Sequence, residues 1–273
     1  MAKVTIASPF GGYEGEYLAA WLEHLRDACR VRDDVECLFL DNSLDAEFHA
    51  RLEAAQRVIP APVRLSDERL RVGDPMTSDG RDIQVSLMWQ RARAMVQTEW
   101  VLTLESDVLI ESDTIEKLLA AIEPAPAIGA ISADVPYRAG FNQDGSWLIL
   151  GMAWKMPKRR HPVSAFLPEP GLNPPPVVWH QPAPPGGVEI VDGIAFGCSL
   201  MKTETLCEVP LLTTWPPCVD YGYDQVFSQD IAKTGKVVAY HWGAPVGHMK
   251  RFEGEEYIEL RELKEKQDAA VLV

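Results

Sequence analysis

The chain has 273 residues, of which 47% are hydrophobic, and a formal net charge of -14 at pH 7. A chain of this length and composition can bury a full core and has the size of one large α/β domain. Its negative charge repels polyanions over the whole surface, which disfavours general nucleic-acid binding but is compatible with a local basic site.

The cysteines and the chain ends indicate a cytoplasmic protein. The five cysteines are scattered and have no C-x-x-C spacing, unlike a disulfide framework or a structural zinc site. The N-terminal residues lack the apolar stretch of a signal peptide, and no run of about 18 apolar residues occurs. We therefore expect reduced thiols and no membrane span.

Strand-like and helix-like patterns alternate along the N-terminal half. Short β-branched or continuous apolar runs predict buried strands, and apolar residues at helical spacing predict the helices between them. Asp113 and Glu116 have the spacing of a capping box at the start of one helix. The expected elements, in order, are a strand at 4–9, a helix from 17 to 25, a strand at 37–40, a helix from 83 to 96, a strand at 100–104 and a helix from 113 to 122.

The second half is less regular. About ten prolines between residues 157 and 187 exclude a regular helix or a central strand there and predict an extended insertion. Regular patterns resume from 188 to 196, a helix is expected from 223 to 233 with Gly235 as its C-terminal cap, and a strand follows at 236–241. The tail from 251 to 273 is charged and predicts a helix or a flexible end. The alternation as a whole predicts an α/β fold with a mostly parallel, Rossmann-like sheet flanked by helices.

Polar residues follow three of the predicted strands. In open α/β sheets, ligands bind where loops leave the carboxyl ends of the strands, which here places Pro9, Phe10, Asp41, Glu105 and Asp107 at one rim. Carboxylates one residue apart, as in Glu105-Ser106-Asp107, can bind a divalent cation that bridges a diphosphate. The alternative is a solvated turn in which the aspartate caps a helix.

Three segments resemble GT-A glycosyltransferases. The segment WVLTLESDVLIESDTIEKLLAAI resembles the one in which an apolar strand delivers the D-x-D motif, with Glu105 in the first acidic place. VDGIAFGCSLMKTETL, which contains Gly197 and Cys198, is similar to the acceptor-side strand. YGYDQVFSQDIAKTGKVVAY resembles the G-E-D helix start, although Tyr223 and Asp230 stand where Glu and Arg are common.

The resemblance implies roles for residues in the second half. Asp224 stands where inverting members place a general base that accepts the proton of the acceptor hydroxyl; the alternative is an acid that complements the helix dipole. The segment APVGHMKR resembles polypeptide N-acetylgalactosaminyltransferases, whose V-G-H supplies a metal ligand, here His248; the alternative is a structural histidine. Lys250 and Arg251 are then placed to neutralise a leaving diphosphate.

The remaining expected contacts are with the donor and the acceptor. Asp41 matches the carboxylate that binds the uracil or ribose of the donor, and Arg81 falls where family members contact the base or diphosphate; an ordinary turn is the alternative for both. The other expected donor-binding residues lie after the first strand, in the Glu105–Asp107 loop and after His248. They are Pro9, Phe10, Glu105, Ser106, Lys250 and Arg251. Candidate acceptor-binding residues are Trp154, Arg159, Arg160, Gly197 and Cys198, since an aromatic ring can stack on a sugar and basic side chains can meet a phosphate.

The resemblance implies one GT-A domain over residues 1–273. Residues 1–125 form its nucleotide-sugar-binding half, and 126–250 form its acceptor-binding and catalytic half with the Pro-rich insertion at 157–187. The implied activity is hexosyl transfer, with Mn²⁺ or Mg²⁺, from a nucleotide-diphosphate donor, expected to be a UDP-sugar. The hydroxyl acceptor is a saccharide, a lipid-linked intermediate, a protein, or a hydroxylated DNA base, as in virus-encoded DNA-modifying glycosyltransferases.

Two other functions stay open at the level of sequence. A sugar nucleotidyltransferase needs a Gly-rich loop after the first strand to hold a triphosphate, and ASPFGGYEGEYL does not have that arrangement. A non-catalytic nucleotide-sugar-binding module is compatible with the departures at Tyr223 and Asp230. The Asp224 segment resembles inverting enzymes and the His248 segment retaining ones, so both stereochemical outcomes remain open.

Overall fold

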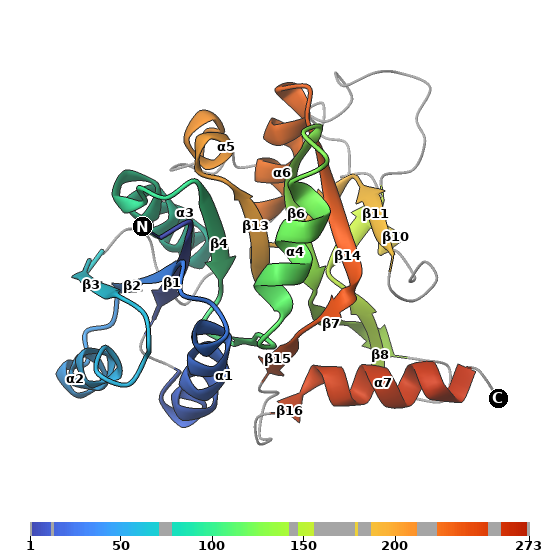
Figure 1. The fold of residues 1–273 in the computed structure, drawn as a ribbon. Coiled ribbons are helices and arrows are strands. Elements are labelled where there is room, and N and C mark those ends of the chain that lie inside the picture. The colour runs from blue at the N-terminus through green and yellow to red at the C-terminus, as the bar shows by residue number, and fades with distance from the viewer. Residues whose placement is uncertain are drawn as a thin grey trace.

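The computed structural model describes residues 2–11, 14–70, 78–141, 147–155, 178–179, 187–211, 223–250 and 258–271. An eight-stranded sheet forms the centre of this part of the chain (Figure 1). From one edge to the other, its strands are β11 (Val188–Val191), β14 (Val237–Pro245), β6 (Ile128–Asp134), β13 (Cys198–Lys202), β4 (Trp100–Leu104), β1 (Val4–Phe10), β2 (Val35–Asp41) and β3 (Val63–Asp67).

Three small sheets accompany the central one. Their strands are β7 (Pro136–Phe141) with β8 (Trp147–Gly151), β9 (Ala153–Lys155) between β10 (Val178–Trp179) and β12 (Gly193–Ile194), and β15 (Gly247–Lys250) between β5 (Val108–Leu109) and β16 (Ile258–Glu259). The last of these brings a C-terminal strand against the segment that follows β4.

The central sheet confirms the expected α/β class with a mostly parallel sheet. Strand β1 runs parallel to β2 and β4, β2 parallel to β3, and β14 parallel to β6. Strand β13 is antiparallel to both β4 and β6, and β11 is antiparallel to β14. In the parallel half, Phe10 pairs with Asp41 and Asp41 with Asp67, so the carboxyl ends of β1, β2 and β3 lie at one edge.

Helices cover both faces of this sheet. On one face, strand residues such as Ile6 form a buried cluster with helices α1, α2 and α4. On the other face, strand residues such as Ala7 form a second buried cluster with helices α3, α5 and α6. Because both faces are covered, strands β1 and β4 are buried along nearly their whole length and do not alternate between buried and exposed residues. The helices are α1 (Leu18–Arg30), α2 (Ala46–Ala55), α3 (Ser78–Met95), α4 (Thr114–Ile122), α5 (Thr203–Glu208), α6 (Tyr223–Lys233), α7 (Leu260–Val271) and the 3₁₀ helix η1 (Glu14–Glu16).

The predicted helix ends have mixed outcomes. Helix α6 spans Tyr223–Lys233 as expected, and Gly235 has a φ of 82°, the left-handed conformation of a C-terminal cap. The capping box at Asp113 is wrong. The Asp113 side chain makes no cap hydrogen bond to α4 and instead forms an ion pair with Lys117 at 3.0 Å.

The least regular predicted segments are described only in part. Of the Pro-rich insertion, only Val178, Trp179 and Gly187 lie within the described residues. The charged tail contains helix α7, which packs on β7, β8 and β15. Within the described ranges, no helix is long and apolar enough to cross a membrane.

A close approach at Gly151 yields a stability prediction. A Cβ atom at Gly151 would lie 2.7 Å from the Tyr240 hydroxyl and 2.8 Å from a ring carbon of Trp242. We expect Gly151→Ala to lower the free energy of unfolding by about 1–3 kcal/mol, since overpacking forces the surrounding groups to shift. Chemical denaturation measures the loss. Gly15→Ala is the matched control, because its Cβ would lie 3.4 Å from the nearest atom, in Arg51; equal unfolding energies for the two variants would contradict the prediction.

Candidate functional site

The segment that follows the carboxyl end of β4 pairs with strand β15. The Glu105 N–H donates to the Gly197 carbonyl at 2.9 Å, and the Met249 N–H donates to the Asp107 carbonyl at 2.7 Å. Strand β15 pairs antiparallel with β5, so that His248 lies opposite Val108. The backbone therefore places Asp107 and His248 side by side, although they are 141 positions apart in the sequence.

The His248 imidazole is oriented with one ring nitrogen towards Asp107. Its side chain is 1% exposed, and Nδ1 lies 2.7 Å from the Pro136 carbonyl oxygen. Because a carbonyl only accepts, Nδ1 carries a proton, and in the neutral form of the ring Nε2 carries the lone pair. Nε2 is buried, makes no hydrogen bond within the described part of the chain, and lies 3.4 Å from Asp107 Oδ2. A buried lone pair facing a carboxylate oxygen is an arrangement that a shared cation satisfies, and metal-binding histidines commonly donate their other N–H to a carbonyl.

A lysine on the same strand supplies a positive charge to this pair. Lys250 Nζ lies 2.6 Å from Asp107 Oδ2. Burial favours the neutral acid at Asp107, but attraction to the Lys250 ammonium outweighs burial and holds the pKa of Asp107 well below its ordinary value. Burial also opposes the charge of Lys250, yet Asp107, with a smaller contribution from Glu105, raises the pKa of this lysine. Both groups are therefore charged at neutral pH.

Glu105 and Ser106 lie beside the Asp107–His248 pair. Ser106 is 6% exposed, and Glu105 Oε2 lies 3.6 Å from the position that a Cβ atom would take at Gly197. In the described ranges no three His, Cys, Asp or Glu side chains gather as a metal cluster. The structure thus brings together Asp107 and His248 and does not add Glu105 to them as a third direct ligand.

The donor residues expected at the other strand ends are mostly engaged within the protein. The Phe10 ring is 1% exposed and packs edge-on against Trp21 and Phe39, with centroids 5.1 and 5.4 Å away. Donor binding by the Phe10 side chain is therefore wrong, because this ring belongs to the core. Pro9 precedes it in β1 and is partly exposed.

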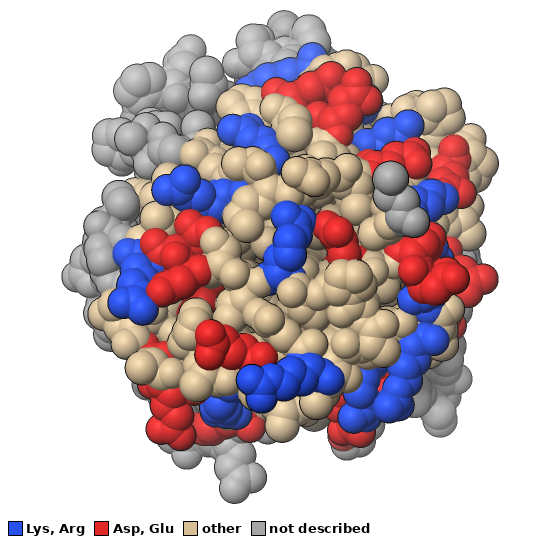
Figure 2. All heavy atoms as spheres, turned by 60° about the vertical axis from the view of Figure 1, so that its left-hand side comes forward, with Lys and Arg blue, Asp and Glu red and all other residues tan. Residues whose placement is uncertain are grey.

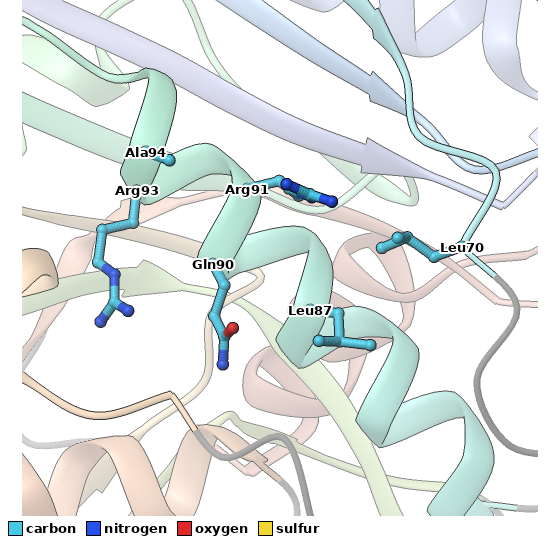
Figure 3. Close-up of a pocket in the computed structure, with 6 residues that line it drawn as sticks. All are labelled: Leu70, Leu87, Gln90, Arg91, Arg93 and Ala94. Carbon is cyan, nitrogen blue, oxygen red and sulfur yellow. The ribbon is translucent and has the colours of Figure 1, made fainter.

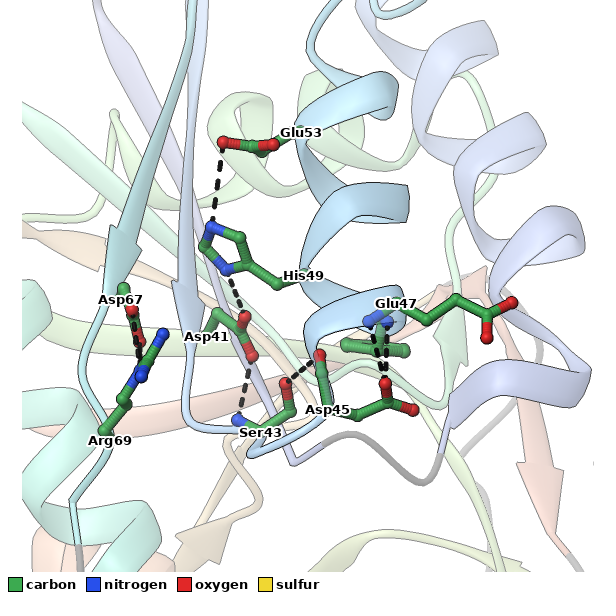
Figure 4. A network of polar contacts seen from close by, with 9 residues as sticks. Asp41, Ser43, Asp45, Glu47, His49, Glu53, Asp67 and Arg69 are labelled. Carbon is green, nitrogen blue, oxygen red and sulfur yellow. Dashed lines mark hydrogen bonds and ion pairs between the residues drawn. The ribbon is translucent and has the colours of Figure 1, made fainter.

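Asp41 lies at the expected edge, but its carboxylate has protein partners. The side chain is 1% exposed; Oδ1 accepts the Ser43 N–H at 2.8 Å, and Oδ2 lies 2.6 Å from His49 Nδ1 (Figure 4). A contact with a donor would use a remaining lone pair of this carboxylate. Arg81 lies on α3 but its side chain is outside the described residues, as is the whole of Arg251.

The acceptor-side prediction is corrected at Cys198. Its side chain is 0% exposed in the core, and burial alone raises the pKa of its thiol well above the ordinary value. The thiol therefore does not reach an acceptor. Gly197 is buried against Glu105. Trp154 lies on β9 with an undescribed side chain, and Arg159 and Arg160 lie outside the described residues.

Helix α6 positions Asp224 through contacts made one turn further on. The Ser228 hydroxyl lies 3.0 Å from the Asp224 carbonyl and accepts the Ile194 N–H at 3.1 Å. The Phe227 ring contacts Phe196 with centroids 4.5 Å apart, and Phe196 directly precedes Gly197. These contacts connect the start of α6 to the turn between β12 and β13, in which Gly197 lies against Glu105.

A separate hollow of about 340 Å³ lies on the outer side of α3. Figure 3 shows its lining by Leu70 and five residues of the helix, none of which is a predicted site residue. Gln90 and Arg93 already donate to the carbonyls of Leu211 and Val209. We assign this hollow no role in the activity.

The face of the molecule in Figure 2 carries interspersed acidic and basic side chains. Charges of both signs alternate on it without a broad basic area. This face is therefore unlike the continuous positive surface that general nucleic-acid binding needs. It leaves the acceptor class open.

The fold and site geometry can be compared with known proteins. No protein-family model and no curated protein sequence matches the chain. The chain is similar to the crystal structure of GalNAc-T7 with UDP, GalNAc and Mn²⁺, with a TM-score of 0.62 and 12% identity over 94% of this chain and 45% of that one. It is also similar to the mannosyltransferase PcManGT from Pyrobaculum calidifontis in complex with GDP-Man and Mn²⁺, with a TM-score of 0.52 and 14% identity over 88% of this chain and 56% of that one.

The chain spans about half the length of these two proteins. At such low identity the likeness establishes the architecture of the chain and not its function. The order of strands and helices and the match over nearly the whole chain agree with the expectation drawn from the motifs. The chain has the GT-A fold.

Proposed function

We propose that the chain is a metal-dependent glycosyltransferase that moves a sugar from a nucleotide-diphosphate donor, expected to be a UDP-sugar, to a hydroxyl acceptor. The observation that carries this proposal is the buried Nε2 of His248, which faces the Asp107 carboxylate at 3.4 Å beyond the carboxyl end of β4. Open α/β sheets bind their ligands at this edge.

The donor atoms of the pair suit a divalent ion. One imidazole nitrogen and one carboxylate oxygen fit Mn²⁺ better than Mg²⁺, which prefers oxygen ligands and retains its waters. Asp107 and His248 would hold the ion, and Glu105 would act on it through water or by its charge. When bound, the ion offsets the negative charge of the leaving nucleotide diphosphate.

Lys250 is proposed to have two partners. In this structure its ammonium pairs with Asp107 at 2.6 Å, and it lies two residues from His248, at the place where a diphosphate would approach. A bound ion would take over the charge of Asp107 and leave the ammonium available to the diphosphate. Arg251 is proposed to act beside it.

The proposed change of Lys250 partner, from Asp107 to the diphosphate, predicts opposite effects of Lys250→Met on metal binding and on turnover. We expect about threefold to tenfold tighter Mn²⁺ binding without donor, because a charge-assisted hydrogen bond no longer competes for Asp107. We also expect slower sugar transfer, because a cation facing the diphosphate is lost. Mn²⁺ titration by electron paramagnetic resonance and a transfer assay measure the two effects. Lys117→Met removes a surface ion pair with Asp113 as a control; weaker Mn²⁺ binding by Lys250→Met would overturn the proposed change of partner.

Asp224 is the proposed general base. It would accept the proton of the acceptor hydroxyl as the oxygen attacks the anomeric carbon of the donor. The contacts of Ser228 and Phe227 support this role, because they hold the start of α6 against the segment that leads into Gly197. Trp154, Arg159, Arg160 and Gly197 remain proposed acceptor contacts.

The test is a panel of nucleotide sugars with Mn²⁺ and candidate acceptors of the saccharide, lipid-linked, protein and hydroxylated-DNA classes. Mass spectrometry detects a mass gain on the acceptor, and phosphatase-coupled detection follows nucleotide release. We expect transfer that stops when EDTA removes the ion. Release of pyrophosphate from a nucleoside triphosphate and a sugar phosphate would instead identify a nucleotidyltransferase, and donor binding without turnover would identify a binding module. The anomeric configuration of the product separates inversion from retention.

A further inference from the structure

The carboxylate of Glu259 joins the start of α7 to the backbone of His248. Its Oε1 accepts the N–H groups of His248 at 3.0 Å and Arg261 at 2.8 Å, and its Oε2 accepts the Glu262 N–H at 3.2 Å. The last two are helix-capping contacts, which satisfy free N–H groups of the first turn. The first is different, because it holds a residue of strand β15 that lies 11 positions earlier.

The fit between Glu259 and β15 is close. Strand β16, which ends at Glu259, pairs with β15 so that Met249 lies opposite Glu259. A Cβ atom at Gly247 would lie 3.0 Å from both Glu259 Oε1 and Leu109 Cβ. A side chain at position 247 would therefore press on the carboxylate that accepts the His248 N–H.

Helix α7 has a second connection to His248. Lys264 forms a buried ion pair with Asp134, whose other oxygen accepts the Tyr240 hydroxyl at 2.9 Å. Asp134 lies two residues before Pro136, whose carbonyl accepts the Nδ1–H of His248. Helix α7 is thus connected to His248 in two ways. Glu259, at its start, accepts the backbone N–H of His248, and Lys264 pairs with Asp134 in the segment whose Pro136 carbonyl accepts the Nδ1–H. Figure 1 shows α7 lying along β15, β7 and β8 at one end of the sheet.

We propose that Glu259 is a positioning residue for His248, and that α7 is the element through which it acts. This inference rests on the proposed metal-binding role of Asp107 and His248. Side chains that orient a metal ligand usually change metal affinity by about 10- to 100-fold when they are removed. We expect this size of effect for Glu259, which contacts the backbone of His248. A residue that only caps a helix would change stability and leave metal affinity as it was.

The experiment compares Mn²⁺ affinity in full-length variants by electron paramagnetic resonance. We expect Glu259→Ala to bind Mn²⁺ about 10- to 100-fold more weakly. Glu259→Gln should bind nearly as well as the unmodified protein, since its amide oxygen can replace Oε1 as an acceptor. Glu262→Ala is the matched control, since it removes an exposed carboxylate from the same first turn without touching His248. Thermal denaturation in EDTA records the stability of each variant.

A second readout uses the metal-free protein. Two-bond ¹H–¹⁵N correlation spectra report which ring nitrogen of His248 carries the proton. We expect the Nδ1–H form in the unmodified protein and in Glu259→Gln, and a mixture of both forms in Glu259→Ala. This readout does not depend on metal binding or on activity.

The outcomes distinguish a failure of the Glu259 role from a failure of the proposed metal site. If Glu259→Ala loses stability but keeps its Mn²⁺ affinity and a single Nδ1–H form, Glu259 is only a helix cap and the inference fails while the proposed function stands. If Asp107→Ala binds Mn²⁺ as well as the unmodified protein, the metal site itself is wrong, and the inference fails with it.

Discussion

Asp107→Ala is expected to abolish the Mn²⁺-dependent part of donor binding. Asp107 pairs with both His248 and Lys250, so the substitution removes a negative charge from the ion site together with half of its proposed protein ligands. An ion that stabilises a leaving diphosphate contributes several kcal/mol, so we expect kcat/KM to fall by about 10³-fold or more. Isothermal titration of a UDP-sugar with and without Mn²⁺ measures the binding loss.

The comparison needs a control for the loss of an acid. Asp113→Ala removes a carboxylate at the exposed start of α4, where Asp113 pairs with Lys117, and it should leave the Mn²⁺ dependence intact. Thermal denaturation in EDTA shows whether each variant is folded. Unchanged donor affinity of folded Asp107→Ala in Mn²⁺ would remove the basis of the proposed site.

Asp224→Asn is expected to separate turnover from binding. An amide cannot accept the acceptor proton, and removal of a general base typically slows a reaction by about 10²-fold or more. Donor binding should change little, because the proposed donor contacts lie on the Asp107 segment and on β15. Steady-state kinetics with saturating donor, combined with donor titration, measure both quantities.

Asp230→Asn is the matched control for this variant. Asp230 lies on the same helix and pairs with Lys233, so it tests whether any loss of an acid on α6 slows the reaction. We expect its turnover to stay within a few-fold of the unmodified protein. A parallel fall of binding and turnover in Asp224→Asn would indicate a structural or metal-binding role instead.

The α/β architecture was predictable because buried strands have a recognisable sequence composition. Val4–Phe10 and Trp100–Leu104 are buried on both faces, so their sequences are short and rich in apolar and β-branched residues. Parallel pairing then brings their carboxyl ends together at one edge. The Asp107–His248 proximity was predicted only by resemblance, because no local pattern links two residues so far apart in sequence.

The orientation of side chains at strand ends was not predictable in the same way. A strand buried on both faces gives no alternation from which to decide which residues face the site. Phe10 and Cys198 were therefore assigned to ligand contacts, whereas both side chains lie in the core. Asp41 was correctly placed at the edge, but its partner His49 comes from α2, a helix whose weak apolar periodicity did not reveal it.

The C-terminal helix shows a further limit. Its first turns are dominated by charged residues, which resemble a solvated tail when they are read alone. Only the fold shows that Lys264 is buried with Asp134 and that Glu259 reaches back to His248. Such contacts depend on tertiary packing, and they leave no periodic trace in the sequence.

The most direct test of the account is pulsed electron paramagnetic resonance of the complex of the protein with Mn²⁺ and UDP. We predict that one bound Mn²⁺ shows both ³¹P coupling from the diphosphate and ¹⁴N coupling from an imidazole. The ¹⁴N coupling should vanish in His248→Ala and persist in His241→Asn. A Mn²⁺–UDP complex without ¹⁴N coupling, or with ¹⁴N coupling that survives in His248→Ala, would contradict the proposal that Asp107 and His248 hold the ion that binds the donor.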